Sequence, residues 1–157
     1  MKSFKDFLYE EILYRGIPSS GHKYGSSPVV WFTYDKEFAK EYSMTDISTR
    51  SSREGRVISI NYKPKRSFDI RDADRRIAIM SFLAEAMKQS KVDFKTIKDK
   101  GTSLRKIIID KFGKREDYVH QYWQDSSVIE FLDLLGFDSI VAMESGRKTI
   151  GIFRDYL

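Results

Sequence analysis

Residues 126–153, SSVIEFLDLLGFDSIVAMESGRKTIGIF, contain the clearest secondary-structure signals of the chain. Its first part carries apolar residues at helical spacing, and Ser127 is followed three residues later by Glu130. That pair is typical of the capping box that opens a helix. Gly136 comes directly after the last apolar residue of the series, where a glycine can take the left-handed conformation that closes a helix. We therefore predict a helix that opens at Ser127 and is stopped by Gly136.

Two strands follow this helix. Residues 137–143 and 148–153 are mostly apolar and aromatic, and the polar residues 144–147 between them are typical of a turn. The unit is therefore helix, glycine, strand, turn, strand. Glu144 is a lone carboxylate at the end of the first of these strands, which makes it the sharpest functional candidate in the chain.

The same rules applied upstream predict one α+β domain over residues 11–157. The segments 17–28 and 43–55 are rich in glycine, proline, serine or threonine and are expected to be loops. Apolar periodicity and caps predict strands at 12–16, 29–33, 56–62 and 68–70, and helices after Asp35, at 72–89, at 103–112 and around Tyr118, Tyr122 and Trp123.

Composition excludes several classes of protein. The 157 residues include no cysteine and only two histidines, so we expect no disulfide, no thiolate nucleophile and no metal site. No apolar run approaches the ~20 residues of a membrane span, so we expect no membrane partner. The net charge of +5 has two interpretations, a weak affinity for nucleic acid or ordinary solvated faces.

The first ten residues, MKSFKDFLYE, also have two interpretations. As a short amphipathic helix, they would pack Phe4, Phe7 and Leu8 on the domain. The string also resembles the N-terminal capsid-targeting peptide of internal head proteins in T-even-like phages, in which a prohead protease cuts after a Glu that follows an aliphatic residue and one other. That resemblance implies cleavage of the bond between Glu10 and Glu11 and packaging in the phage head.

Three segments in order, LYRG (13–16), WFTYDKEFAKEYS (31–43) and GFDSIVAMESGRKTIGIF (136–153), resemble the ADP-ribosyltransferase fold of phage and polyvalent proteins. In that family an Arg or His followed by Gly ends the first strand. An aromatic residue and a Thr or Ser then precede an Ala-x-x-Tyr helix, and a Glu lies near the last strand. The resemblance implies a split, mostly antiparallel β-core with helices inserted between residues 71 and 135, and NAD as substrate.

The resemblance also implies roles for five residues. Arg15 would bind the phosphates of NAD, Gly16 would let the backbone approach the nicotinamide amide, and Thr33 would hold the nicotinamide ribose. Tyr42 would stack on nicotinamide, and Glu144 would bind the ribose 2′-hydroxyl and align the acceptor. Such a set suits the chemistry, because loss of nicotinamide passes through an oxocarbenium-like state. Each of three residues also has a purely structural interpretation: Arg15 as a surface arginine, Thr33 as a strand-forming residue and Tyr42 as a core tyrosine.

The resulting hypothesis is a phage-encoded, NAD-dependent mono-ADP-ribosyltransferase. It would be a monomer, act on a host protein or nucleic acid in the host cytoplasm, and be packaged in the head and injected to counter host defence. Two positions depart from the family: Ser139 replaces a glycine, and Lys148 and Thr149 stand where many relatives have the Glu. A catalytically degenerate protein that inhibits a host defence enzyme by binding therefore stays open, as do Asp125 and Asp138 as reserve carboxylates.

Overall fold

The structure is a computed structural model that describes residues 11–19, 21–44, 55–72, 77–90, 92, 94–113 and 119–157. Its strands are β1 (Glu11–Ile17), β2 (Val29–Thr33), β3 (Arg56–Tyr62), β4 (Ser67–Asp69), β5 (Ser139–Glu144) and β6 (Arg147–Phe153). Its helices are α2 (Lys36–Ser43), α3 (Ile79–Gln89), α4 (Phe94–Phe112), α5 (Val119–Tyr122), α6 (Ser126–Leu134) and the short 3-10 helix η1 (Arg154–Tyr156). These elements confirm the prediction of an α+β protein.

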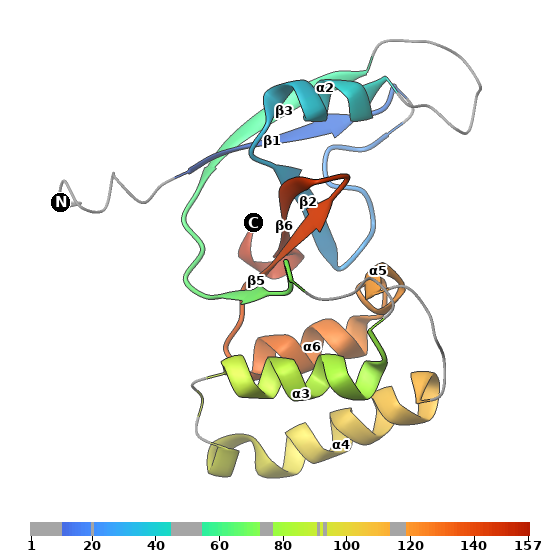
Figure 1. Cartoon of the computed structure of the whole chain (residues 1–157), viewed down its shortest axis with the longest axis vertical. Helices are drawn as coiled ribbons and strands as arrows, with labels where there is room; N and C mark the ends of the chain where they lie inside the picture. The colour runs from blue at the N-terminus through green and yellow to red at the C-terminus, as the bar shows by residue number, and fades with distance from the viewer. Residues whose placement is uncertain are drawn as a thin grey trace, which may run out of the picture.

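The strands form a six-stranded sheet in the order β3-β1-β2-β6-β5-β4. Pairing of β4 with β5 is parallel and the other pairings are antiparallel. β1 pairs with β3 along its whole length, but it meets β2 at a single residue pair, Tyr14 with Thr33. The sheet is therefore divided into a part made of β3 and β1 and a part made of β2, β6, β5 and β4, and the two parts diverge from that pair (Figure 1).

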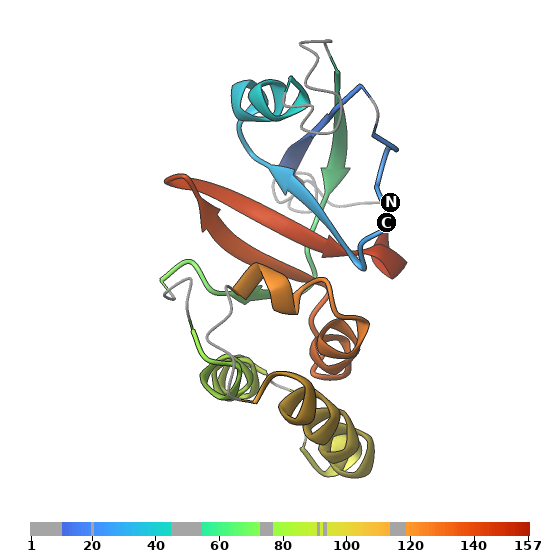
Figure 2. The ribbon, with the colours of Figure 1, turned by 90° about the vertical axis from the view of Figure 1, so that its right-hand side faces the viewer.

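Alternating side chains place a separate apolar cluster on each face of the larger part, because successive residues of a strand point to opposite faces. Val29 and Phe153 face the inserted helices, and Val30 and Ile152 face β1. Figures 1 and 2 show α3, α4 and α6 gathered on one side of the strands, with α2 at the far end of the molecule. The helical layer buries Phe68, Phe82, Ile108, Tyr122, Val128, Leu132 and Phe137 against the sheet.

The C-terminal unit has the predicted order, with one correction at its start. The residue that caps α6 is Asp125, whose carboxylate accepts a hydrogen bond from the Ser127 N–H at 2.8 Å. Ser127 itself lies inside the helix, so the predicted capping box is wrong. Gly136 has φ of +90°, as its predicted role in ending the helix requires. Ser145 and Gly146, with φ of +50° and +75°, make the two-residue turn between β5 and β6.

Other predicted boundaries are wrong for tertiary reasons. The helix expected at 72–89 begins at Ile79, and the one expected at 103–112 begins at Phe94, where it packs along α6. The strand expected from residue 137 begins at Ser139. Packing outweighs local propensity in setting such ends. Met80, Ala84 and Ile107 belong to the apolar patterns that predicted these two helices, but all three are exposed.

Some expectations fall on parts of the chain outside the described residues. They are the helix or targeting peptide at 1–10, most of the loop at 43–55, residues 73–76 of the predicted 72–89 helix, and Tyr118. None of the helices that the structure describes is long and apolar enough to cross a membrane.

Candidate active site

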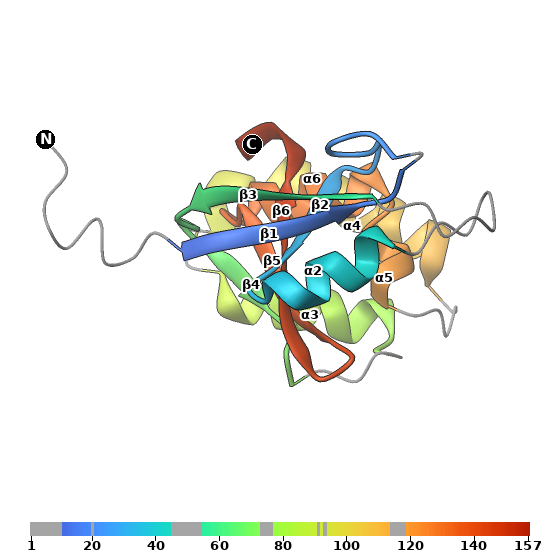
Figure 3. The same ribbon diagram turned by 90° about the horizontal axis from the view of Figure 1, so that it is seen from above.

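A cavity of about 860 Å³ opens where β1 and β2 separate. Its walls come from β1, the loop between β1 and β2, α2, the end of β5 and α5. Seen from above, α2 and α5 lie on the same side of β1 (Figure 3). The five residues predicted from the resemblance all line this cavity, namely Arg15, Gly16, Thr33, Tyr42 and Glu144. The structure therefore brings residues of the consecutive elements β1, β2 and α2 together with the end of β5, which lies about 100 residues further along the chain.

Arg15 is a half-buried side chain that holds the neighbouring loop. Its Nε donates to the carbonyl oxygen of Lys23 at 3.0 Å, and its Nη1 donates to the carbonyl oxygen of Trp31 at 2.9 Å. Burial lowers the pKa of its guanidinium, and the nearby charge of Arg154 acts in the same direction. A purely surface arginine is thus excluded. Its remaining terminal nitrogen, Nη2, lies near Gly25, 3.7 Å from where a Cβ would stand on that glycine.

Gly16 is required by packing, whatever its role toward a ligand. A Cβ on this residue would lie 2.0 Å from the carbonyl oxygen of Ala39 and 2.8 Å from the amide nitrogen of Ser43. Both atoms belong to the backbone of α2. The missing side chain therefore lets α2 lie directly on β1 and brings Tyr42 to the edge of the cavity.

Thr33 links the end of β2 to the start of α2. Its Oγ1 accepts a hydrogen bond from the Asp35 N–H at 3.1 Å, and Asp35 caps α2 as predicted. Thr33 is buried and pairs with the buried Thr149 of β6, which also lines the cavity. The accepted bond leaves the Thr33 hydroxyl its own hydrogen to donate.

Tyr42 and Glu144 lie at the opening of the cavity. Tyr42 is 55% exposed, so it is not the core tyrosine of the alternative interpretation. Glu144 ends β5 opposite Arg147, and its side chain is exposed. Arg147 turns instead to α2, with its Nη1 3.4 Å from a carboxylate oxygen of Glu41 and its guanidinium 4.6 Å from the ring centroid of Phe38. Within the described part of the chain, Glu144 is left without a cation partner.

One wall of the large cavity is aromatic, which the sequence did not predict. Trp31 and Trp123 both line the cavity, with their ring centroids 4.6 Å apart at an interplanar angle of 40°. The Nε1 of Trp123 is buried and donates to no acceptor among the described residues. Trp31 lies over Gly151, its partner in β6, where a Cβ would come within 3.0 Å of the indole. In the sequence, the aromatic residues Tyr118, Tyr122 and Trp123 indicate a helix and not a ligand-facing wall.

The two reserve carboxylates lie outside the cavity. Asp125 caps α6 and pairs with the Lys111 ammonium at 3.1 Å. Asp138 is buried and accepts hydrogen bonds from the Tyr62 hydroxyl at 3.0 Å, the Lys65 N–H at 2.7 Å and the Ser139 hydroxyl at 2.8 Å. It thereby ties the connection between β3 and β4 to the start of β5. Both carboxylates therefore stabilise the fold, Asp125 as a helix cap and Asp138 as the acceptor of a buried hydrogen-bond network.

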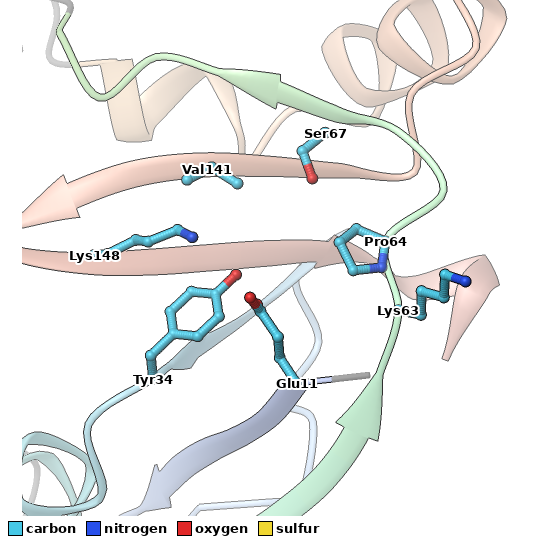
Figure 4. A pocket seen from close by; sticks show the side chains of 7 residues that line it. All are labelled: Glu11, Tyr34, Lys63, Pro64, Ser67, Val141 and Lys148. Atoms are coloured by element: carbon cyan, nitrogen blue, oxygen red, sulfur yellow. The ribbon is translucent and has the colours of Figure 1, made fainter. Parts of the chain in front are cut away.

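A second, smaller cavity of about 280 Å³ contains none of the predicted site residues. Figure 4 shows Tyr34 and Glu11 pointing toward one another from its lower wall, with Lys148 beside them. Burial, and then the charge and hydrogen bond of Glu11, raise the pKa of the Tyr34 hydroxyl. The Lys148 Nζ lies 4.3 Å from the Tyr34 ring centroid. These contacts hold the beginning of β1 against the β2 and β6 side of the sheet.

In the described parts of the chain, no group of three or more His, Asp or Glu side chains is placed to hold a metal ion. No protein-family model matches this chain, and no curated protein or solved structure matches it either. The chemistry of the large cavity therefore has to be inferred from the residues that line it.

Proposed function

We propose that this protein is an NAD-dependent mono-ADP-ribosyltransferase encoded by a phage, with an ADP-ribosyltransferase-like core. One observation supports the proposal above all: the five residues that the family resemblance selected line a single cavity of about 860 Å³. That volume lies within the range of roughly 300–1,000 Å³ typical of cofactor and small-molecule sites.

Three kinds of group on the walls of the cavity support NAD as the proposed substrate. The guanidinium of Arg15 supplies positive charge for a phosphate, and the exposed ring of Tyr42 offers a face for a planar nicotinamide. The hydroxyl of Thr33 has a hydrogen to donate to a ribose oxygen. Glu144 lies at the opening, where a macromolecular acceptor has access to it.

The proposed reaction breaks the glycosidic bond between ribose C1′ and the nicotinamide nitrogen. The bonding electrons leave with nicotinamide, which becomes neutral, and an electron pair of the acceptor forms the new bond to C1′. The acceptor loses a proton in this step, and the proposal assigns the Glu144 carboxylate, which lines the cavity, to take it. The same carboxylate stabilises the positive charge that develops on the ribose.

Transfer of label from biotinylated NAD into host lysate tests this proposal. Wild-type protein is expected to label a macromolecule, and Glu144→Gln is expected to lower labelling by at least about 100-fold while leaving NAD affinity within a few-fold, since the contact acts mainly in the transition state. Glu130→Gln, an exposed glutamate on α6 outside the cavity, is the matched control and should label normally. Full activity of Glu144→Gln would remove Glu144 from the mechanism.

Binding of NAD can be followed separately, because both tryptophans of the chain line the cavity and their fluorescence should change on binding. Binding without any transfer would favour the alternative function, a catalytically degenerate protein that inhibits a host defence enzyme by binding. The position of Thr149, where many relatives of the proposed family carry the Glu, is the observation behind that alternative. Failure of NAD to bind would reject the NAD-dependent proposal.

A further inference from the structure

Two arginines from opposite ends of the chain hold the loop that forms one wall of the large cavity. Arg154 donates from Nε to the Ser27 carbonyl oxygen at 2.9 Å, and from Nη2 to the carbonyl oxygens of Tyr24 at 2.9 Å and Gly25 at 2.8 Å. Arg15 donates to the Lys23 carbonyl oxygen at 3.0 Å. The carbonyl groups of this loop are thus turned toward guanidinium groups.

This arrangement determines where a backbone N–H of the loop points. In a trans peptide the C=O and the following N–H point in opposite directions, and no peptide bond of the described residues is cis. Because the Gly25 C=O points to Arg154, the Ser26 N–H points away from Arg154. Gly25, Ser26 and Ser27 line the cavity and Arg154 does not. The Ser26 N–H is therefore directed to the cavity side of the loop.

Ser26 offers hydrogen-bond donors on that side. Ser26 is exposed, and neither its N–H nor its hydroxyl has a hydrogen-bond partner among the described residues. Gly25 has φ of +63°, and its own N–H donates to the carbonyl oxygen of His22 at 3.3 Å, whereas the Ser26 N–H that follows makes no such bond to a described residue. The Arg15 Nη2 lies beside this turn. Backbone N–H, hydroxyl and guanidinium donors together are the usual ligands of a phosphate oxygen.

We propose that the turn at Gly25, Ser26 and Ser27 is a phosphate-binding cradle, in which the Ser26 N–H and hydroxyl and the Arg15 Nη2 bind one phosphate group of a nucleotide substrate. Arg154 does not touch the phosphate; it positions the loop by holding its carbonyl groups on the other side. The inference rests on the proposed function insofar as the nucleotide is NAD, whose pyrophosphate would be the group bound.

The decisive variant is Ser26→Asp, which puts a negative charge into the cradle at an exposed position where the fold should tolerate it. ADP-ribose and inorganic pyrophosphate are the probes, titrated into the full chain by calorimetry. Ser26→Asp is expected to weaken both by at least about tenfold, through charge repulsion and the lost hydroxyl. Ser81→Asp, with the same charge change at an exposed position of α3 outside the cavity, should bind both probes like the wild type.

Ser26→Ala separates the two donors of this residue. It keeps the backbone N–H and is expected to lose no more than a few-fold in affinity for either probe. A loss as large as that of Ser26→Asp would show that the hydroxyl accounts for the binding and would overturn the phosphate contact proposed for the Ser26 N–H.

The cradle and the proposed function fail in different ways. If Ser26→Asp binds both probes as tightly as the wild type does, or if the wild type binds neither, the cradle is wrong, even when ADP-ribose transfer from NAD is observed. If no transfer is observed but pyrophosphate binding depends on Ser26, the cradle stands and the transferase proposal loses support.

Discussion

Replacement of Gly16 by alanine is the sharpest test of how the large cavity is built. The added Cβ would stand 2.0 Å from the carbonyl oxygen of Ala39, whereas ordinary contact begins at 3.4 Å. The backbone of α2 would have to retreat by 1.4 Å, the difference of these two distances. Because the obstructing atom is backbone and cannot rotate away, we expect a loss of about 3 kcal/mol, the upper end of the overpacking range.

That loss corresponds to a melting temperature lowered by roughly 6–12 °C in a domain of this size, measured by circular dichroism. Gly101→Ala, inside α4, is the matched control, because the atoms nearest to its Cβ would be side-chain atoms of Leu134 and Ile97 at the ordinary contact distances of 3.7 and 3.8 Å. Alanine is favoured over glycine within a helix by about 0.5–1 kcal/mol, so this variant should melt roughly 1–4 °C higher.

Substitution by alanine is therefore expected to lower the melting temperature at Gly16 and to raise it at Gly101. A Gly16→Ala variant that melts within about 2 °C of the wild type would refute the close packing of α2 on β1. In that case approach of a ligand, and not of α2, would be the reason for glycine at this position.

Three further predictions concern other parts of the fold. Asp125→Ala should cost about 1 kcal/mol of stability at neutral pH. Burial alone would raise the pKa of the Asp125 carboxyl, but its hydrogen bonds lower this pKa below the usual value, so the stability that Asp125 adds is present above the normal aspartate pKa and is lost as the pH falls through the lowered pKa. In denaturant titrations at acid pH, the stability of the variant should therefore fall less steeply than that of the wild type. Asp138→Ala should cost about 3–5 kcal/mol in chemical denaturation, because a buried network including the Tyr62 hydroxyl loses its acceptor, and a cost below about 1 kcal/mol would contradict that network. A chain that starts at Glu11 should keep nearly the same melting temperature, since β1 begins there; a drop of about ten degrees would show that residues 1–10 pack on the core.

Structural elements that have local causes could be predicted from the amino-acid sequence alone. The order helix, glycine, strand, turn, strand at the C-terminus was predicted from residues 126–153, because helix ends and turns depend on the φ of one residue or on a cap a few residues away. Gly136, the Ser145–Gly146 turn and the Asp35 cap of α2 behave as such local signals require. The resemblance to a known family was needed to select the five cavity residues, and local patterns alone single out only Glu144.

Features that depend on residues far apart in the sequence could not be predicted and are known from the folded structure. The strand order brings β1 and the end of β5 to one cavity, and no periodicity encodes a strand order. The early start of α4 follows from packing along α6, and the place of Trp123 beside Trp31 follows from where the helical layer meets β2. Arg154 holds the loop at Gly25 across 129 residues of chain. Such a hydrogen bond forms only after the chain has closed on itself, so its geometry is a property of the folded molecule.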